Sequence, residues 1–141
     1  MTLPPVAMPY AVGVGLALLI ALFLRSARFD RDRAVYPVIL IVTASYYVLF
    51  AVLGGSLHAL TIETVVVLGF AVAAVAGFAV NSWWIVAGLA GHGVFDLVHG
   101  RLIANPGVPS WWPAFCLSFD VGLSAWLAVV LIRGKRLPGH S

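Results

Sequence analysis

Two histidines and an aspartate lie close together in one short apolar segment of the chain. His92, Asp96 and His99 fall within the sequence GHGVFDLVHG, residues 91–100. On an α-helix, spacings of four and three residues place these side chains on one face, within about 60° of arc. Imidazole nitrogens and carboxylate oxygens on inward helix faces are how helical bundles bind zinc, iron or manganese. The segment therefore predicts a divalent-metal site with His92, Asp96 and His99 as ligands.

Two further carboxylates lie inside other apolar runs. Glu63 precedes the histidine segment and Asp120 follows it. Ionisable groups at such positions are costly and therefore rare without a partner or a function. We expect Glu63 and Asp120 to complete the metal's ligand shell. Alternatively, they act with Asp96 as catalytic acid and base groups.

Aromatic side chains and one cysteine surround these polar positions in the sequence. Cys116 lies four residues before Asp120, so the two share a helix face. We expect an apolar substrate pocket near the metal, lined by Tyr46, Tyr47, Trp112, Cys116 and Phe119. Such a pocket would admit a lipophilic small molecule from the membrane.

The composition indicates an integral membrane protein. Of 141 residues, 62% are hydrophobic and only 9% are charged, with a mean hydropathy of +1.07. A membrane-spanning helix needs about 20 mainly apolar residues, so the chain has room for a single transmembrane domain, residues 1–141. Its basic residues form short clusters beside apolar runs instead of one basic face, so we expect membrane lipids and no nucleic acid as partners. A homo-oligomer is compatible with this composition.

Five apolar runs predict the elements that position the polar residues. The expected fold is an all-α integral membrane protein, a bundle of five transmembrane helices. The predicted helices cover residues 8–24, 34–53, 59–80, 83–99 and 113–132. The fourth run, which contains the two histidines, is the least hydrophobic, and it is as short as the first.

The distribution of arginine and lysine predicts how this bundle is oriented. Basic residues concentrate in the first connection and after the fifth run: Arg25, Arg28, Arg31, Arg33, Arg133, Lys135 and Arg136. Because cytoplasmic connections carry the excess of basic residues, the N-terminus is expected outside and the C-terminus in the cytoplasm of a multi-pass cell-membrane protein. At 1.5 Å of rise per residue, Glu63, Asp96 and Asp120 would all lie in the outer half of the bundle.

The residue types leave several functions open. With a metal, the site would activate water or dioxygen, as a hydrolase or an oxidoreductase does. Without a metal, a buried carboxyl group that keeps its proton could serve as the general acid of an isomerase or cyclase. Chains of Asp, Glu and His also mark proton or cation transport, and such residues can simply form hydrogen bonds that fix helix register.

The segment GLAGHGVFDLVHG, followed by NPGVP and AFCLSFD, resembles a family of small integral membrane proteins classed as domain of unknown function 6010. In that family a His, a Trp-Asp pair and one or two further His lie on one helix. A proline-bearing loop follows, and then a Cys with an Asp four residues later. The matching residues here are His92, Asp96, His99, Cys116 and Asp120, whereas Phe95 and Gly100 replace the usual Trp and second His. Glu63 matches a glutamate of that family more loosely. The resemblance implies no known reaction.

Overall fold

The computed structural model describes residues 2–135 as an all-helical bundle. The α-helices are α1 (Met8–Ser26), α2 (Val35–Leu53), α3 (Leu57–Ala79), α4 (Trp83–Leu102) and α5 (Trp112–Lys135), with a single turn of 3₁₀ helix, η1 (Phe29–Arg31), between α1 and α2. The expected all-α class is therefore confirmed. The fourth helix continues to Leu102, three residues beyond the expected end. Arg136, which we counted with the basic cluster after the last helix, lies outside the described residues.

Four of these helices have the character of membrane spans. Among residues 2–135, α1, α2, α3 and α5 are long and apolar enough to cross a bilayer. Helix α4 is not among them, because it carries His92, Asp96, His99 and Arg101 within its 20 residues. The four apolar helices are consistent with a membrane protein.

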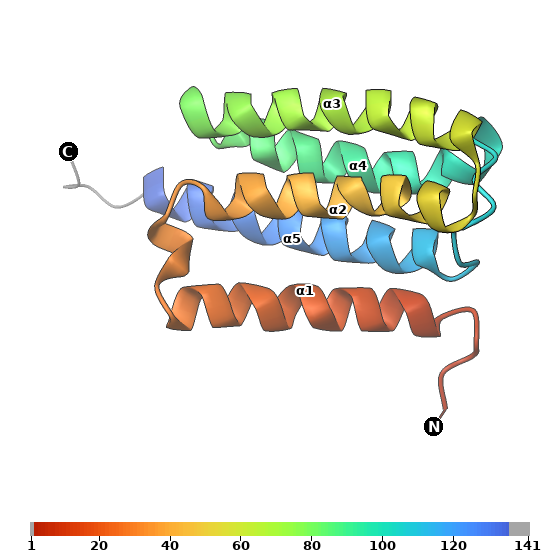
Figure 1. The fold of residues 1–141 in the computed structure, drawn as a ribbon. Coiled ribbons are helices and arrows are strands. Elements are labelled where there is room, and N and C mark those ends of the chain that lie inside the picture. The colour runs from red at the N-terminus through yellow and green to blue at the C-terminus, as the bar shows by residue number, and fades with distance from the viewer. Residues whose placement is uncertain (1, 136–141) are drawn as a thin grey trace.

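The helices pack side by side, and α1 occupies one edge of the bundle. Helix α1 lies along α5, α5 along α4, and α3 along both α4 and α2, as Figure 1 shows. A Cβ atom at Gly13 would lie 2.0 Å from Ser118 Oγ and 2.4 Å from the carbonyl oxygen of Phe115. Glycine at this position therefore permits the close approach of α1 to α5, as small residues do between membrane helices.

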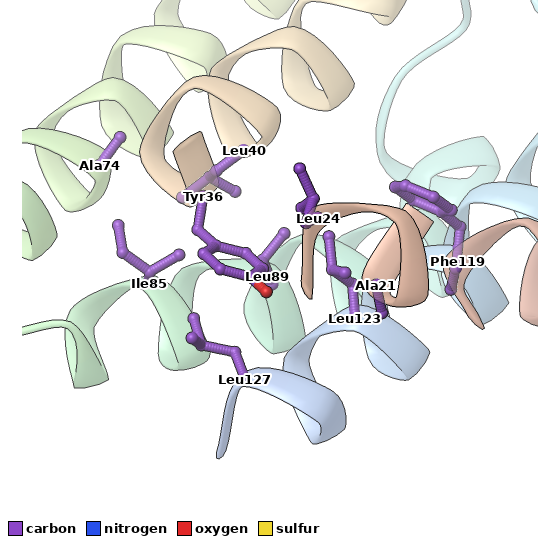
Figure 2. Packing of buried hydrophobic residues seen from close by; sticks show 11 residues of the cluster. Ala21, Leu24, Tyr36, Leu40, Ala74, Ile85, Leu89, Phe119, Leu123 and Leu127 are labelled. Atoms are coloured by element: carbon purple, nitrogen blue, oxygen red, sulfur yellow. The ribbon is translucent and has the colours of Figure 1, made fainter. Parts of the chain in front are cut away.

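Apolar side chains fill one half of the bundle. Figure 2 shows this cluster, in which the first turns of α2 and α4 meet the second half of α1, the middle of α5 and Ala74 of α3. Its largest members are Leu24, Tyr36, Leu40, Ile85, Leu89, Phe119, Leu123 and Leu127. The buried ionisable residues therefore lie at the other end of the bundle, near the α2–α3 and α4–α5 connections.

Candidate functional site

Five ionisable side chains lie in one buried layer of the bundle. Each of them is at most 2% exposed, and they come from three helices: Glu63 from α3, His92, Asp96 and His99 from α4, and Asp120 from α5. The structure thus buries all five residues that we expected to be ligands or catalytic groups, and it divides them into two groups. Helix α4 supplies three of them because their spacing keeps them on its inward face.

The first group of side chains in this layer is built around the contact between His92 and Asp120. The Nδ1 atom of His92 lies 2.5 Å from Asp120 Oδ2 and 3.5 Å from Asp96 Oδ2. The thiol of Cys116 donates a hydrogen bond to Asp120 Oδ2 at 3.4 Å. His92, Asp96, Cys116 and Asp120 each offer one potential ligand atom, and these atoms all lie within 4.8 Å of one another. We call these four residues the ligand cluster, and they could hold a metal ion.

Three polar atoms of the ligand cluster have unused bonding capacity. Within the described part of the chain, His92 Nε2, Asp96 Oδ2 and Asp120 Oδ1 are buried and have no hydrogen-bond partner. Buried polar atoms in native proteins nearly always have one, and an exception calls for an explanation. A nitrogen and two carboxylate oxygens are the donor set that suits zinc, iron or manganese.

Glu63 and His99 form a separate pair beside the ligand cluster. His99 Nε2 lies 2.5 Å from Glu63 Oε1, and Asn105 Nδ2 donates to the same oxygen at 3.0 Å. Neither Glu63 nor His99 belongs to the ligand cluster. Glu63 and His99, which we expected to be metal ligands, therefore contact each other. His99 contacts Glu63 of α3, whereas His92 contacts Asp120 of α5.

Tyr47 connects the two halves of the site. Its hydroxyl donates a hydrogen bond to Asp96 Oδ1 at 2.6 Å. Its ring stacks on the imidazole of His99, with ring centres 3.9 Å apart and planes inclined by 12°. We expected Tyr47 in the wall of a substrate pocket, but its side chain is bound within the polar site.

Asn105 is a site residue that the sequence interpretation missed. Besides Glu63, its amide donates to the backbone oxygen of Tyr47 at 3.0 Å. The connection that carries it packs tightly on the end of α2, since a Cβ atom at Gly107 would lie 1.8 Å from the carbonyl oxygen of Phe50. The sequence signal was the Asn-Pro-Gly triplet, because such residues mark a defined turn. This turn positions Asn105 over the Glu63–His99 pair.

An apolar cavity reaches the ligand cluster from the side. It has a volume of about 350 Å³ and lies between α1, α2 and α5. Four of the expected pocket residues line it, namely Tyr46, Trp112, Cys116 and Phe119, whereas Tyr47 does not. Cys116 belongs both to this lining and to the ligand cluster, so the cavity ends at the polar site.

The fold and site define a helical bundle of membrane-protein character with a buried His-carboxylate cluster. Comparison of the chain with models of protein families, with curated proteins and with solved structures found no match. The resemblance to family 6010 stays a prediction that depends on the sequence motifs.

Proposed function

We propose that this chain is a small membrane-embedded enzyme that binds one divalent metal ion through His92, Asp96 and Asp120 and acts on a lipophilic substrate. The observation that carries the proposal is the ligand cluster, whose four buried residues offer ligand atoms within 4.8 Å of one another. The adjoining apolar cavity supports a substrate that dissolves in the bilayer.

Charge balance supports a divalent cation at this position. The carboxylates of Asp96 and Asp120 carry two negative charges, and a neutral His92 imidazole carries none, so a divalent ion makes the group neutral. The Glu63–His99 pair is neutral by itself, whether ionised or not. Uncompensated charge is costly in a buried membrane site. With this assignment, the metal group and the Glu63–His99 pair each carry no net charge.

The same charge balance indicates that Cys116 stays a neutral thiol beside the metal. A thiolate ligand would add a further negative charge to the buried group, whereas the thiol already donates to Asp120. Three protein ligands would then leave a coordination position for water or substrate, which is typical of catalytic zinc sites. A bound zinc, iron or manganese ion would supply Lewis-acid or water-activating chemistry, as in a hydrolase or an oxidoreductase.

The proposal places α4 across the membrane as a fifth span, with the N-terminus outside and the C-terminus in the cytoplasm. A helix of 20 residues is about 30 Å long, enough to cross the hydrocarbon core. The polar side chains His92, Asp96 and His99 of α4 are buried in the bundle, so they do not meet lipid. The excess of arginine beside α1 and α5 supports this orientation in a cell membrane.

A metal-free acid–base enzyme is the second candidate. The His92–Asp120 contact of 2.5 Å and the Tyr47–Asp96 hydrogen bond of 2.6 Å favour it, because they place proton donors and acceptors side by side. Such a site could isomerise or cyclise a lipophilic substrate. Transport of protons or cations is less well supported, since all the buried charged or imidazole side chains among the described residues belong to the site: Glu63, His92, Asp96, His99 and Asp120.

Metal analysis of the protein, purified without a histidine tag, tests the proposal. We expect close to one zinc, iron or manganese ion per chain, and loss of that ion in His92→Ala and Asp96→Asn. Two matched histidine variants serve as controls. His58→Ala alters an exposed histidine on α3, and His99→Ala alters the histidine outside the ligand cluster. Both should retain the metal.

The outcomes separate the candidate functions. A well-folded wild-type protein that binds no added divalent metal would overturn the metal proposal and favour the acid–base enzyme. Proton flux in liposomes that depends on Asp96 would favour transport. Retention of metal in His92→Ala with loss in His99→Ala would move the site to the Glu63–His99 pair.

A further inference from the structure

We infer that the cavity between α1, α2 and α5 binds a single hydrocarbon chain, which enters sideways from the bilayer and carries a small uncharged end group to Cys116. The inference rests on the proposed function and names its substrate class. That class is single-chain lipids with a neutral polar end, such as long-chain alcohols or aldehydes.

The packing of the helices creates the cavity. Helix α1 packs on α5 while α2 packs on α3 and α4, so α1 and α2 do not pack closely on each other, and the cavity lies between them. Its volume of about 350 Å³ lies at the lower end of the range of small-molecule sites. At roughly 30 Å³ per water-sized group, it holds about a dozen methylene groups. One chain of that length fits.

The lining of the cavity selects a hydrocarbon chain. Leu16 and Ile20 of α1 face Ile39 and Val42 of α2 across it, and no charged side chain among the described residues contributes to the wall. The hydroxyl of Thr43, which also lines the cavity, donates to the backbone oxygen of Leu40 at 3.0 Å. The hydroxyl hydrogen of Thr43 is therefore already bonded within the helix. The wall makes mainly apolar contacts with a bound molecule.

The cavity opens on the outer surface of the bundle. Val38 and Val42 line the cavity and are 54% and 47% exposed. Both belong to α2, one of the apolar helices that are long enough to span a membrane. In the bilayer this side would meet acyl chains, so a lipid chain could enter without crossing water.

The inner end of the cavity selects an uncharged end group. Cys116 lies at this end, and its thiol donates to Asp120 Oδ2. With the divalent ion bound, the group of His92, Asp96 and Asp120 is neutral in our assignment, so a fatty-acid carboxylate would add an uncompensated buried charge, which is costly. An alcohol or aldehyde oxygen carries no charge and could approach the cluster from the cavity.

Photolabelling of the purified, metal-containing protein in phosphatidylcholine nanodiscs tests the inference. The probe is a dodecanol analogue with a diazirine near the middle of its chain, and mass spectrometry locates its adducts. We expect adducts on cavity-lining residues of α1, α2 and α5, with competition by dodecanol and weaker competition by dodecanoate. Ile20→Trp fills the cavity and should reduce this labelling about tenfold. Leu19→Trp on the exposed side of the same helix should leave it unchanged.

Adducts spread over exposed residues of α3 in the wild-type protein would overturn the inference, and so would equal labelling of the two tryptophan variants. The wild-type adduct map decides the question even if Ile20→Trp fails to fold. Metal content is measured on the same samples. Specific labelling of a protein that binds no metal would refute the metal site but not the chain site, whereas diffuse labelling of a metal-containing protein would refute only the chain site.

Discussion

At the scale of single residues, the site consists of paired charges and shared hydrogen bonds. Asp120 accepts from Cys116 and contacts His92, while Asp96 accepts from Tyr47. Each carboxylate thus keeps one oxygen engaged by the protein and has another without a partner. His92, Asp96, Cys116 and Asp120 thus offer potential ligand atoms within 4.8 Å of one another.

The hydroxyl of Tyr47 holds Asp96 in position, so its removal should weaken metal binding without abolishing it. Loss of such a supporting hydrogen bond typically costs about 10- to 100-fold in metal affinity. We therefore expect Tyr47→Phe to lower the affinity by that factor in a competition titration with a chelator. Tyr46→Phe is the matched control, because Tyr46 lines the cavity instead. Equal affinities of the two variants would contradict this role.

Replacement of the Cys116 thiol should leave the metal in place. In our assignment the thiol is a neutral neighbour of the metal and a hydrogen-bond donor to Asp120. Cys116→Ser preserves a donor at the same position, so we expect wild-type metal content by elemental analysis. If the variant lost its metal while it remained folded, Cys116 would have to be a thiolate ligand.

The sequence was sufficient to find the buried ionisable residues but not to predict which of them contact each other. The spacing of His92, Asp96 and His99 fixes a common helix face, since helix periodicity is local. It does not determine that His92 meets Asp120 while His99 meets Glu63. Those contacts depend on the rotation of α3 and α5 against α4, which only tertiary packing sets.

At the scale of elements, small residues control how closely the helices and loops approach. Gly88 of α4 faces Leu40, Gly93 faces Leu117 and Val121 of α5, and Gly107 lies against α2. Gly91, in contrast, has open space around its Cα atom. Some glycines of α4 therefore permit close packing with a neighbouring helix and others do not, although all of them are close together in the sequence.

Two glycine substitutions test this difference. Gly107→Ala should destabilise the protein by about 1–3 kcal/mol, because the added methyl group meets the Phe50 carbonyl and displaces the turn that carries Asn105. Gly91→Ala should be neutral or stabilising by about 0.5–1 kcal/mol, because alanine favours the helix and meets nothing. Thermal unfolding in detergent measures both. Equal melting temperatures would show that the α4–α5 turn is not packed as described.

The elements themselves followed from apolar run length. The fourth helix extends to Leu102 because Gly100 and Arg101 continue it, although both end the apolar pattern. The role of Asn105 could not be predicted, since it depends on a turn docking against Tyr47 and Glu63, residues distant in sequence.

At the scale of the whole molecule, the bundle is divided into an apolar end and a polar end. Leucine-rich packing fills the first, the ligand cluster lies toward the second, and the cavity extends from the ligand cluster along the apolar packing. With the proposed orientation, the polar end lies in the outer half of the membrane. The amount of apolar sequence predicted a helical bundle, whereas the cavity depends on α1 packing on α5 instead of α2, which no local pattern encodes.

Cysteine accessibility tests the orientation and the span of α4. Asn81 and Ser110 are exposed residues near the two ends of α4. In a Cys116→Ala background, we expect a membrane-impermeant maleimide to label Ser110→Cys on intact cells and to label Asn81→Cys only after permeabilisation. If both positions were labelled from the same side, α4 would not span the membrane.

X-ray absorption spectroscopy of the bound metal tests the central claim most directly. With His92, Asp96 and Asp120 as the protein ligands, we predict a spectrum of imidazole nitrogen and oxygen neighbours at about 2.0–2.2 Å for zinc. We also predict no sulfur neighbour at about 2.3 Å, the distance of a thiolate ligand. The imidazole signal should persist in His99→Ala, whereas His92→Ala should hold no metal that could give one. A sulfur neighbour, or an imidazole signal unchanged in His92→Ala, would contradict the proposed site.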